Sequence, residues 1–131
     1  MEWSVDIDPE AALVRIRAWG AARLEGFVGY AREVQEHPAW QPGMAILVDL
    51  QDLDLTPMKA DDINRLVAIQ KTYSKDAVSG PIATVVSRLV DFGIVRMWEA
   101  HVSSTGRNHR VFTDLDEARA WLLQQTGRSR P

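Results

Sequence analysis

The sequence contains no cysteine, which excludes disulfides, thiolate nucleophiles, zinc–thiolate sites and iron–sulfur clusters. It also has no apolar run of the roughly 18 residues that a membrane-spanning helix needs, so we expect no stable membrane insertion. A basic excess is missing as well, since the net charge is −3 at pH 7, and this argues against nucleic acid as a partner. The chain begins without the basic and apolar stretches of a secretory signal, which predicts a cytoplasmic protein.

What is present is an ordinary globular composition. The chain has 131 residues, of which 46% are hydrophobic and 25% are charged. These values are typical of one soluble domain with a single core. We therefore predict one α/β domain over residues 1–124, followed by a disordered tail over residues 125–131.

Two kinds of pattern predict the strands. Val14 and Ile16 alternate with Arg15 and Arg17, which indicates a strand buried on one face. The nearly continuous apolar run 44–50 instead suits a central strand that is buried on both faces. The expected strands cover residues 3–7, 13–18, 44–50, 82–87 and 109–112, and the short connection after residue 7 makes the first two an antiparallel hairpin.

Helical spacing of apolar residues predicts four helices, over residues 21–37, from residue 57 onward, 89–102 and 115–124. Thr56 and Pro57 fit an N-cap followed by proline at the first helical position. Thr113 and Asp116 have the spacing of a capping box that opens the last helix. Strands that alternate with helices favour parallel pairing. The predicted fold is therefore α/β, with a five-stranded mixed sheet that begins with the antiparallel hairpin and carries four helices.

Several strings have an order and spacing known from one family. They are Phe27-x-x-Tyr30, His37-Pro38-x-Trp40-x-x-Gly43, Ile46-Leu47-Val48-Asp49-Leu50, Asp91-Phe92-Gly93-Ile94-Val95-Arg96-Met97, and Val111-Phe112-x-Asp114-Leu115-Asp116-Glu117-Ala118-x-x-Trp121-Leu122. The chain thereby resembles the SpoIIAA-like family of the STAS fold group, whose structural relatives include the CRAL-TRIO lipid-transfer domains. The resemblance implies a small regulatory or ligand-binding domain rather than an enzyme, with no cofactor.

One departure from the STAS pattern concerns the phosphorylated serine of the anti-sigma antagonists. That serine opens the helix after the central strand, and the matching segment here is Pro57-Met58-Lys59-Ala60. No hydroxyl stands at the switch position, and Thr56 comes two or three residues too early. The resemblance therefore implies a STAS-like module without the phosphoswitch.

An acidic group after the central strand is the strongest candidate for cation chemistry. It comprises Asp49, Asp52, Asp54, Asp61 and Asp62. Carboxylate oxygens suit Mg²⁺ or Ca²⁺, but the spacing fits no calcium loop. The alternative assigns Asp61 and Asp62 to the start of a helix, where the dipole favours negative charge, and Asp52 and Asp54 to a solvated loop. We favour this second interpretation and predict no metal site.

Candidate ligand-binding residues are Asp49, His37 and Trp40. Asp49 ends the central strand, at the edge where open α/β sheets bind ligands. A general base needs a positioned partner, and no pattern supplies one for His37. The structural alternative places His37 at a helix C-terminus and Trp40 as a lid over the end of the core.

The predicted helix 89–102 has too many apolar residues for one narrow stripe: Val90, Ile94, Val95, Met97, Trp98 and Val102. A homodimer interface, an apolar ligand pocket and plain core packing all account for this excess. The candidate interaction residues are Ile94, Met97 and Trp98 on this helix, together with Met58 and Lys59.

Two functions follow. The first is a non-enzymatic regulatory or protein-interaction module, expected to form a homodimer. The alternative is a carrier or sensor of a small apolar or amphipathic, lipid-like ligand, by analogy of fold alone. A closed apolar cavity of a few hundred Å³ is what the carrier needs and the interaction module does not.

Overall fold

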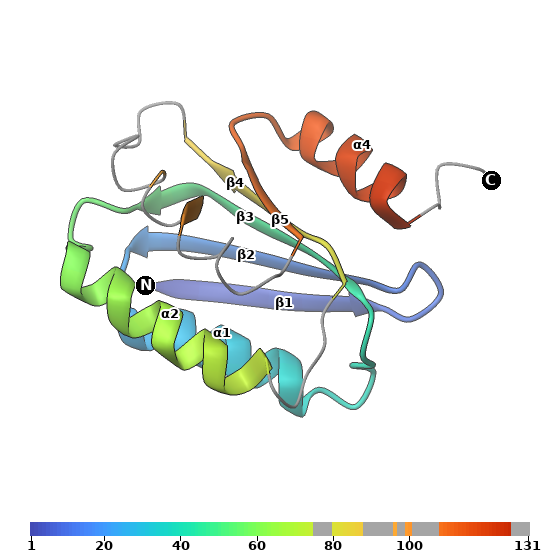
Figure 1. Ribbon diagram of the computed structural model, residues 1–131, viewed down its shortest axis with the longest axis horizontal. Helices are drawn as coiled ribbons and strands as arrows, with labels where there is room; N and C mark the ends of the chain where they lie inside the picture. Colours follow the sequence, from blue (N-terminus) through green and yellow to red (C-terminus); the bar gives the residue numbers. More distant parts are fainter. Residues whose placement is uncertain (75–79, 88–95, 97–98, 101–107, 127–131) are drawn as a thin grey trace.

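The computed structural model describes residues 1–74, 80–87, 96, 99–100 and 108–126. Five strands form one sheet in the order β1-β2-β3-β4-β5 (Figure 1). In chain order the elements are β1 (Glu2–Asp8), β2 (Leu13–Ala21), α1 (Leu24–Glu36), β3 (Ala45–Asp54), α2 (Ala60–Ser74), β4 (Ile82–Val86), β5 (His109–Phe112) and α4 (Leu115–Thr126). The predicted α/β fold with a mixed five-stranded sheet is confirmed.

Strands β1 and β2 form the predicted antiparallel hairpin, and the remaining neighbours pair in parallel. In the hairpin turn, Asp8 accepts hydrogen bonds from the backbone N–H groups of Glu10 and Ala11. The alternation along β2 is also as predicted. Val14 and Ile16 are buried, whereas Arg15 and Arg17 are exposed on the opposite face of the sheet.

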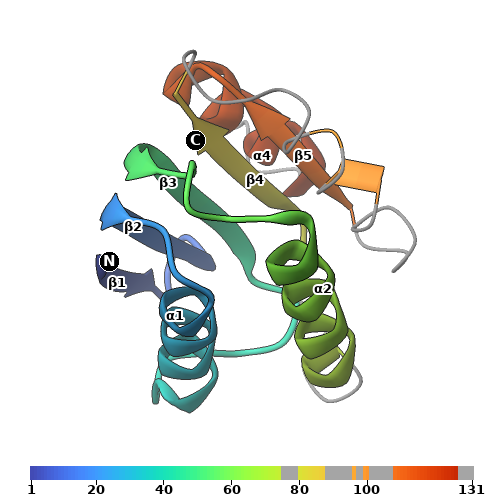
Figure 2. The same cartoon turned by 90° about the vertical axis from the view of Figure 1, so that its left-hand side faces the viewer.

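The sheet lies between two layers of helices (Figure 2). Helices α1 and α2 cover one face, and α4 covers β3, β4 and β5 on the other. Each face has its own core. The larger core contains Val14, Val48 and Leu50 beneath α1 and α2, and the smaller core contains Leu47 and Val85 beneath α4. Residues of β3 contribute to both cores, which confirms a central strand buried on both faces.

Strands β2 and β3 extend three or more residues past their predicted ends. The sequence predicts that residues 51–55 form a loop and that the second strand ends at residue 18. In the structure, however, Trp19–Ala21 pairs with Asp52–Asp54 beyond an irregularity in the register. The predictions fail because the backbone N–H and C=O groups of these two segments pair with each other. The segments are 33 residues apart, so no local pattern indicates this pairing.

The start of α2 is also corrected. The N-cap predicted at Thr56 is wrong, because the helix begins at Ala60. Asp54 Oδ1 accepts hydrogen bonds from the backbone N–H and the hydroxyl of Thr56, at 3.0 and 2.7 Å, and this holds Thr56 in a turn. Asp62 instead accepts a hydrogen bond from the backbone N–H of Lys59 at 3.1 Å. Asp61 and Asp62 do lie in the first turn of the helix, as predicted.

The last helix begins where it was predicted, but with a different cap. The capping box of Thr113 and Asp116 is wrong, because Asp114 Oδ1 accepts hydrogen bonds from the backbone N–H groups of Asp116 and Glu117. The helix continues to Thr126, so the predicted tail begins two residues too early. Residues 127–131 lie outside the described residues. So does most of the predicted helix 89–102, of which Arg96, Glu99 and Ala100 are helical.

Candidate functional site

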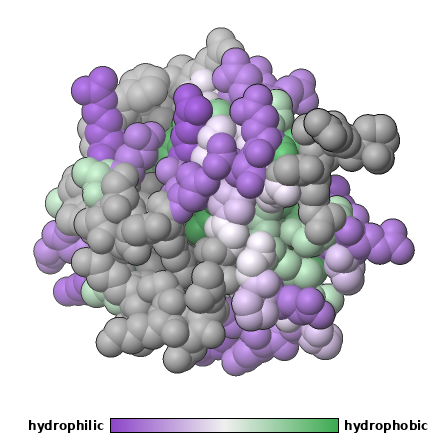
Figure 3. Space-filling view, turned by 45° about the vertical axis from the view of Figure 1, so that its right-hand side comes forward, coloured by the Kyte–Doolittle hydropathy of each residue, from purple (hydrophilic) through white to green (hydrophobic). Residues whose placement is uncertain are grey.

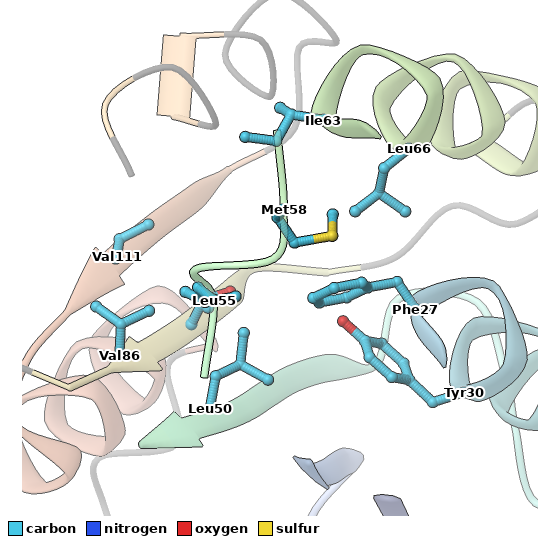
Figure 4. Close-up of a pocket in the computed structure, with 10 residues that line it drawn as sticks. Phe27, Tyr30, Leu50, Leu55, Met58, Ile63, Leu66, Val86 and Val111 are labelled. Atoms are coloured by element: carbon cyan, nitrogen blue, oxygen red, sulfur yellow. The ribbon is translucent and has the colours of Figure 1, made fainter. Parts of the chain in front are cut away.

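An apolar pocket lies between α1, the start of α2 and the sheet (Figure 4). Its lining residues come from both helices, from the turn before α2 and from strands β3, β4 and β5: Phe27, Tyr30, Leu50, Leu55, Met58, Ile63, Leu66, Thr84, Val86 and Val111. Eight of these ten side chains carry no hydrogen-bonding oxygen or nitrogen. The pocket therefore favours an apolar occupant.

Helical spacing explains two of its walls. Phe27 and Tyr30 are three residues apart on α1, so both point toward the sheet, and their rings meet edge to face with centroids 5.7 Å apart. Ile63 and Leu66 have the same spacing on α2 and are buried. Met58 closes the gap between the two helices from the turn that precedes α2 (Figure 4).

The pocket has two polar points. Thr84 on β4 is 6% exposed and is the one buried polar residue in the part of the chain that the structure describes. Its Oγ1 lies 2.7 Å from Nε2 of His109, which satisfies the hydroxyl by a hydrogen bond. The second point is the Tyr30 hydroxyl, and burial raises the pKa of this group.

The cavity volume is about 60 Å³. That is room for about four or five atoms of the size of a water oxygen. A branched aliphatic side chain or a molecule of similar size fits this space. The sequence-based hypothesis of a carrier called for a closed cavity of a few hundred Å³, and the pocket lined by the described residues is smaller than that.

Of the predicted interaction residues, Met58 lines this pocket and is 5% exposed, whereas Lys59 next to it is exposed. Ile94, Met97 and Trp98 lie outside the described residues. Among the described residues of the predicted interaction set, Met58 is therefore the one that lines the pocket.

The predicted ligand-binding residues are not brought together. Trp40 packs against the larger core, on the face of the sheet that α1 and α2 cover. Asp49 lies on the opposite face, beside Arg15 and Arg119. His37 is the C-cap of α1, and its Nδ1 accepts a hydrogen bond from the backbone N–H of Ala39 at 3.1 Å. None of the three lines the apolar pocket.

The acidic group is dispersed rather than convergent. Asp52 forms an ion pair with Arg17 at 2.9 Å, and both side chains are more than half exposed. The hydrogen bonds from Thr56 lower the pKa of Asp54. Among the described residues, no group of three or more acidic or histidine side chains is arranged to hold a metal ion.

A second hollow of about 210 Å³ lies on the other face of the sheet, beside α4. It is charged: Arg15, Arg17 and Arg119 line it together with Asp6 and Asp49. Arg15 binds Asp6 at 3.0 Å, and Arg17 binds Asp52 outside the hollow. The arginines and carboxylates are interspersed, as on a solvated surface.

The described surface carries few large apolar side chains. Leu123 on α4, at 44% exposure, is the one large hydrophobic residue that is exposed in this part of the chain. Figure 3 shows the same character on one side of the molecule, where hydrophilic residues surround small hydrophobic areas. None of the described helices has the length and apolarity to cross a membrane.

Sequence reasoning missed the contact between Thr84 and His109. The available signal was the single polar residue within the apolar strand 82–86, which had to find a partner if it was buried. The partner follows only from the register, which pairs Ile82 with His109 and so places both side chains on one face.

The chain was compared with protein-family models, curated proteins and solved structures, and none of them matches it. The resemblance to the SpoIIAA-like family therefore rests on the sequence strings alone.

Proposed function

We propose that this chain is a non-enzymatic regulatory or protein-interaction module of STAS-like type that lacks the phosphoswitch serine. The observation that carries the proposal is the apolar pocket beside the start of α2. Met58 forms part of its wall, and Lys59 is exposed next to it. This turn is the segment that corresponds, by the sequence resemblance, to the regulatory site of the anti-sigma antagonists.

The size of the pocket supports a protein partner. About 60 Å³ accommodates one aliphatic side chain, and interfaces commonly centre on an apolar anchor that fills a pocket. The exposed charges around this turn and the start of α2 are of both signs, Asp54 and Asp61 being acidic and Lys59 and Arg65 basic. This surface suits a partner segment whose apolar anchor is flanked by charges of both signs.

A photo-crosslinking amino acid at position 59 tests this function in cells. We expect an adduct with one discrete protein, and we expect Leu55→Phe to abolish it by filling the edge of the pocket. Leu123→Phe is the matched control, because it makes the same change on α4, and it should leave the adduct intact. An adduct that persists in the folded Leu55→Phe variant would contradict the proposal.

The predicted homodimer is a separate part of this proposal. It rests on the apolar excess of the helix predicted over residues 89–102, in particular Ile94, Met97 and Trp98. Native mass spectrometry of gently purified protein tests it. A dimer of unmodified mass supports self-association, and an unliganded monomer at micromolar concentration contradicts it.

A carrier or sensor of a small amphipathic ligand is the second candidate, and the two hydroxyl groups of Thr84 and Tyr30 in an apolar pocket favour it. The volume restricts the ligand to a few atoms, so a long acyl chain does not suit the pocket as it stands. In the same mass spectra, a monomer with a small added mass that leaves on denaturation would support this candidate.

A further inference from the structure

Thr84 is the one polar residue on a face of β4 whose other side chains are apolar. Ile82, Val86 and Thr84 point from β4 toward the same face of the sheet, and all three are buried. A valine has nearly the same shape as threonine and would bury no polar atom. Packing alone therefore does not require the hydroxyl group, which adds a hydrogen-bonding group to an otherwise apolar surface.

The register of β4 and β5 fixes that hydroxyl. Ile82 pairs with His109, and Thr84 pairs with Val111, so the imidazole reaches Thr84 diagonally from the neighbouring strand. In the 2.7 Å contact between Oγ1 of Thr84 and Nε2 of His109, the threonine hydroxyl either donates its proton or accepts a hydrogen bond through one lone pair. A hydroxyl has one donor and two acceptor positions, so Thr84 keeps hydrogen-bonding capacity beyond this contact.

A second hydroxyl lies in the same pocket. Tyr30 projects from α1 beside Phe27, and its hydroxyl end points inward among apolar side chains (Figure 4). Among the described residues, no hydrogen bond partner accompanies this hydroxyl. Buried tyrosine hydroxyls usually have a partner, because an unsatisfied one costs free energy. An oxygen atom of a bound molecule would supply it.

The described lining contains no charged side chain. An ionised ligand would lose its hydration there without gaining a counter-charge, which is costly. A neutral ligand with a short hydrocarbon body loses little hydration free energy, and moving its apolar surface from water to the apolar walls is favourable.

We propose that the pocket binds a small neutral molecule of about four or five non-hydrogen atoms that carries one oxygen, and that Thr84, positioned by His109, selects for this oxygen. This inference rests on the second candidate function, a carrier or sensor of a small amphipathic ligand, and specifies the class of that ligand. Simple alcohols and ketones belong to it.

Two isosteric probes test the selection: 2-butanol and 2-methylbutane, which differ by a hydroxyl in place of a methyl group. Binding of each to the full chain is followed by the NMR shifts of the Met58 and Leu66 methyl groups. We expect Thr84→Val to weaken the binding of 2-butanol by about three- to tenfold, which is the equivalent of one hydrogen bond. The affinity for 2-methylbutane should stay the same or increase.

The control is Thr126→Val, which removes a hydroxyl that bonds to the Leu122 carbonyl on α4, away from the pocket. It should change neither affinity. Equal changes for both probes in Thr84→Val, or no change for 2-butanol, would overturn the role of Thr84 while leaving the pocket a ligand site. If neither probe shifted the methyl signals of the wild type, the second candidate function itself would be overturned.

Discussion

Gly29 of α1 lies directly against the indole ring of Trp3 on β1. A Cβ atom at position 29 would lie 2.7 Å from Cη2 of the indole, closer than packed atoms approach. The glycine therefore allows the helix to approach the edge strand of the sheet. This close contact explains why a residue of low helix propensity stands in the middle of α1.

Gly29→Ala should consequently destabilise the protein by about 1–3 kcal/mol, although alanine is the better helix former. Urea denaturation measures the change. Trp3→Phe removes the part of the indole that would clash, so the alanine substitution should cost less in that background. Equal costs in both backgrounds would show that the ring is not the reason.

The cap of α4 gives a second prediction. Asp114 accepts hydrogen bonds from two backbone N–H groups, whereas the sequence pattern predicts Thr113 as the capping residue. Asp114→Ala should lower the free energy of unfolding by about 1 kcal/mol, and Thr113→Ala should change it by less. Thermal denaturation of the two variants distinguishes them, and a larger loss from Thr113→Ala would refute this assignment.

Neighbouring leucines on α4 provide a matched pair. Leu122 is 4% exposed in the smaller core, and Leu123 is 44% exposed. Leu122→Ala should cost about 2–5 kcal/mol through lost burial and the cavity left behind. Leu123→Ala should cost well under half as much. Denaturant titrations of both variants test whether α4 packs on the sheet through this face, and similar losses would argue against it.

Alkaline pH should destabilise the protein through Tyr30. Burial raises its pKa above the ordinary value of 10.0, so above pH 10 the unfolded chain loses this proton before the folded chain does. The stability contribution of the protonated hydroxyl is complete below pH 10 and is lost as the pH rises toward the folded pKa. Tyr30→Phe should therefore lose less stability than the wild type between pH 9 and 11. Parallel curves from chemical denaturation would contradict this.

Gly80 and Gly43 lie against one another, and the backbone requires each for a different reason. A Cβ at position 80 would lie 2.5 Å from the Gly43 carbonyl oxygen, whereas Gly43 has open space but a φ of +90°. We expect Gly80→Ala to be the more destabilising, because neither backbone can yield. Gly43→Asn should be better tolerated than Gly43→Ala, since asparagine accepts positive φ more readily. Melting temperatures of the three variants test this order.

Local patterns predicted the order and the buried faces of the described strands, but not several element ends or the contacts between elements. The alternation around Val14 and the apolar run in β3 predicted which faces are buried, because burial follows the period of a strand. The extension of β3 to Asp54 depends on pairing with Trp19–Ala21, which no local pattern contains. The pocket escaped prediction for the same reason: Thr84 and His109 are 25 residues apart, and only the strand register places them together.

Strand β1 leaves one edge of the sheet without a neighbouring strand in the described part of the chain. Three of its outer-face residues are acidic: Glu2, Asp6 and Asp8. If two copies joined antiparallel through this edge with Trp3 and Val5 on a common face, carboxylates would stand opposite carboxylates in each register that pairs five or more residues of the strand. Such like-charge pairs disfavour the contact. The edge thus discourages the chain from growing into continuous intermolecular sheets, and so helps to keep concentrated solutions from aggregating.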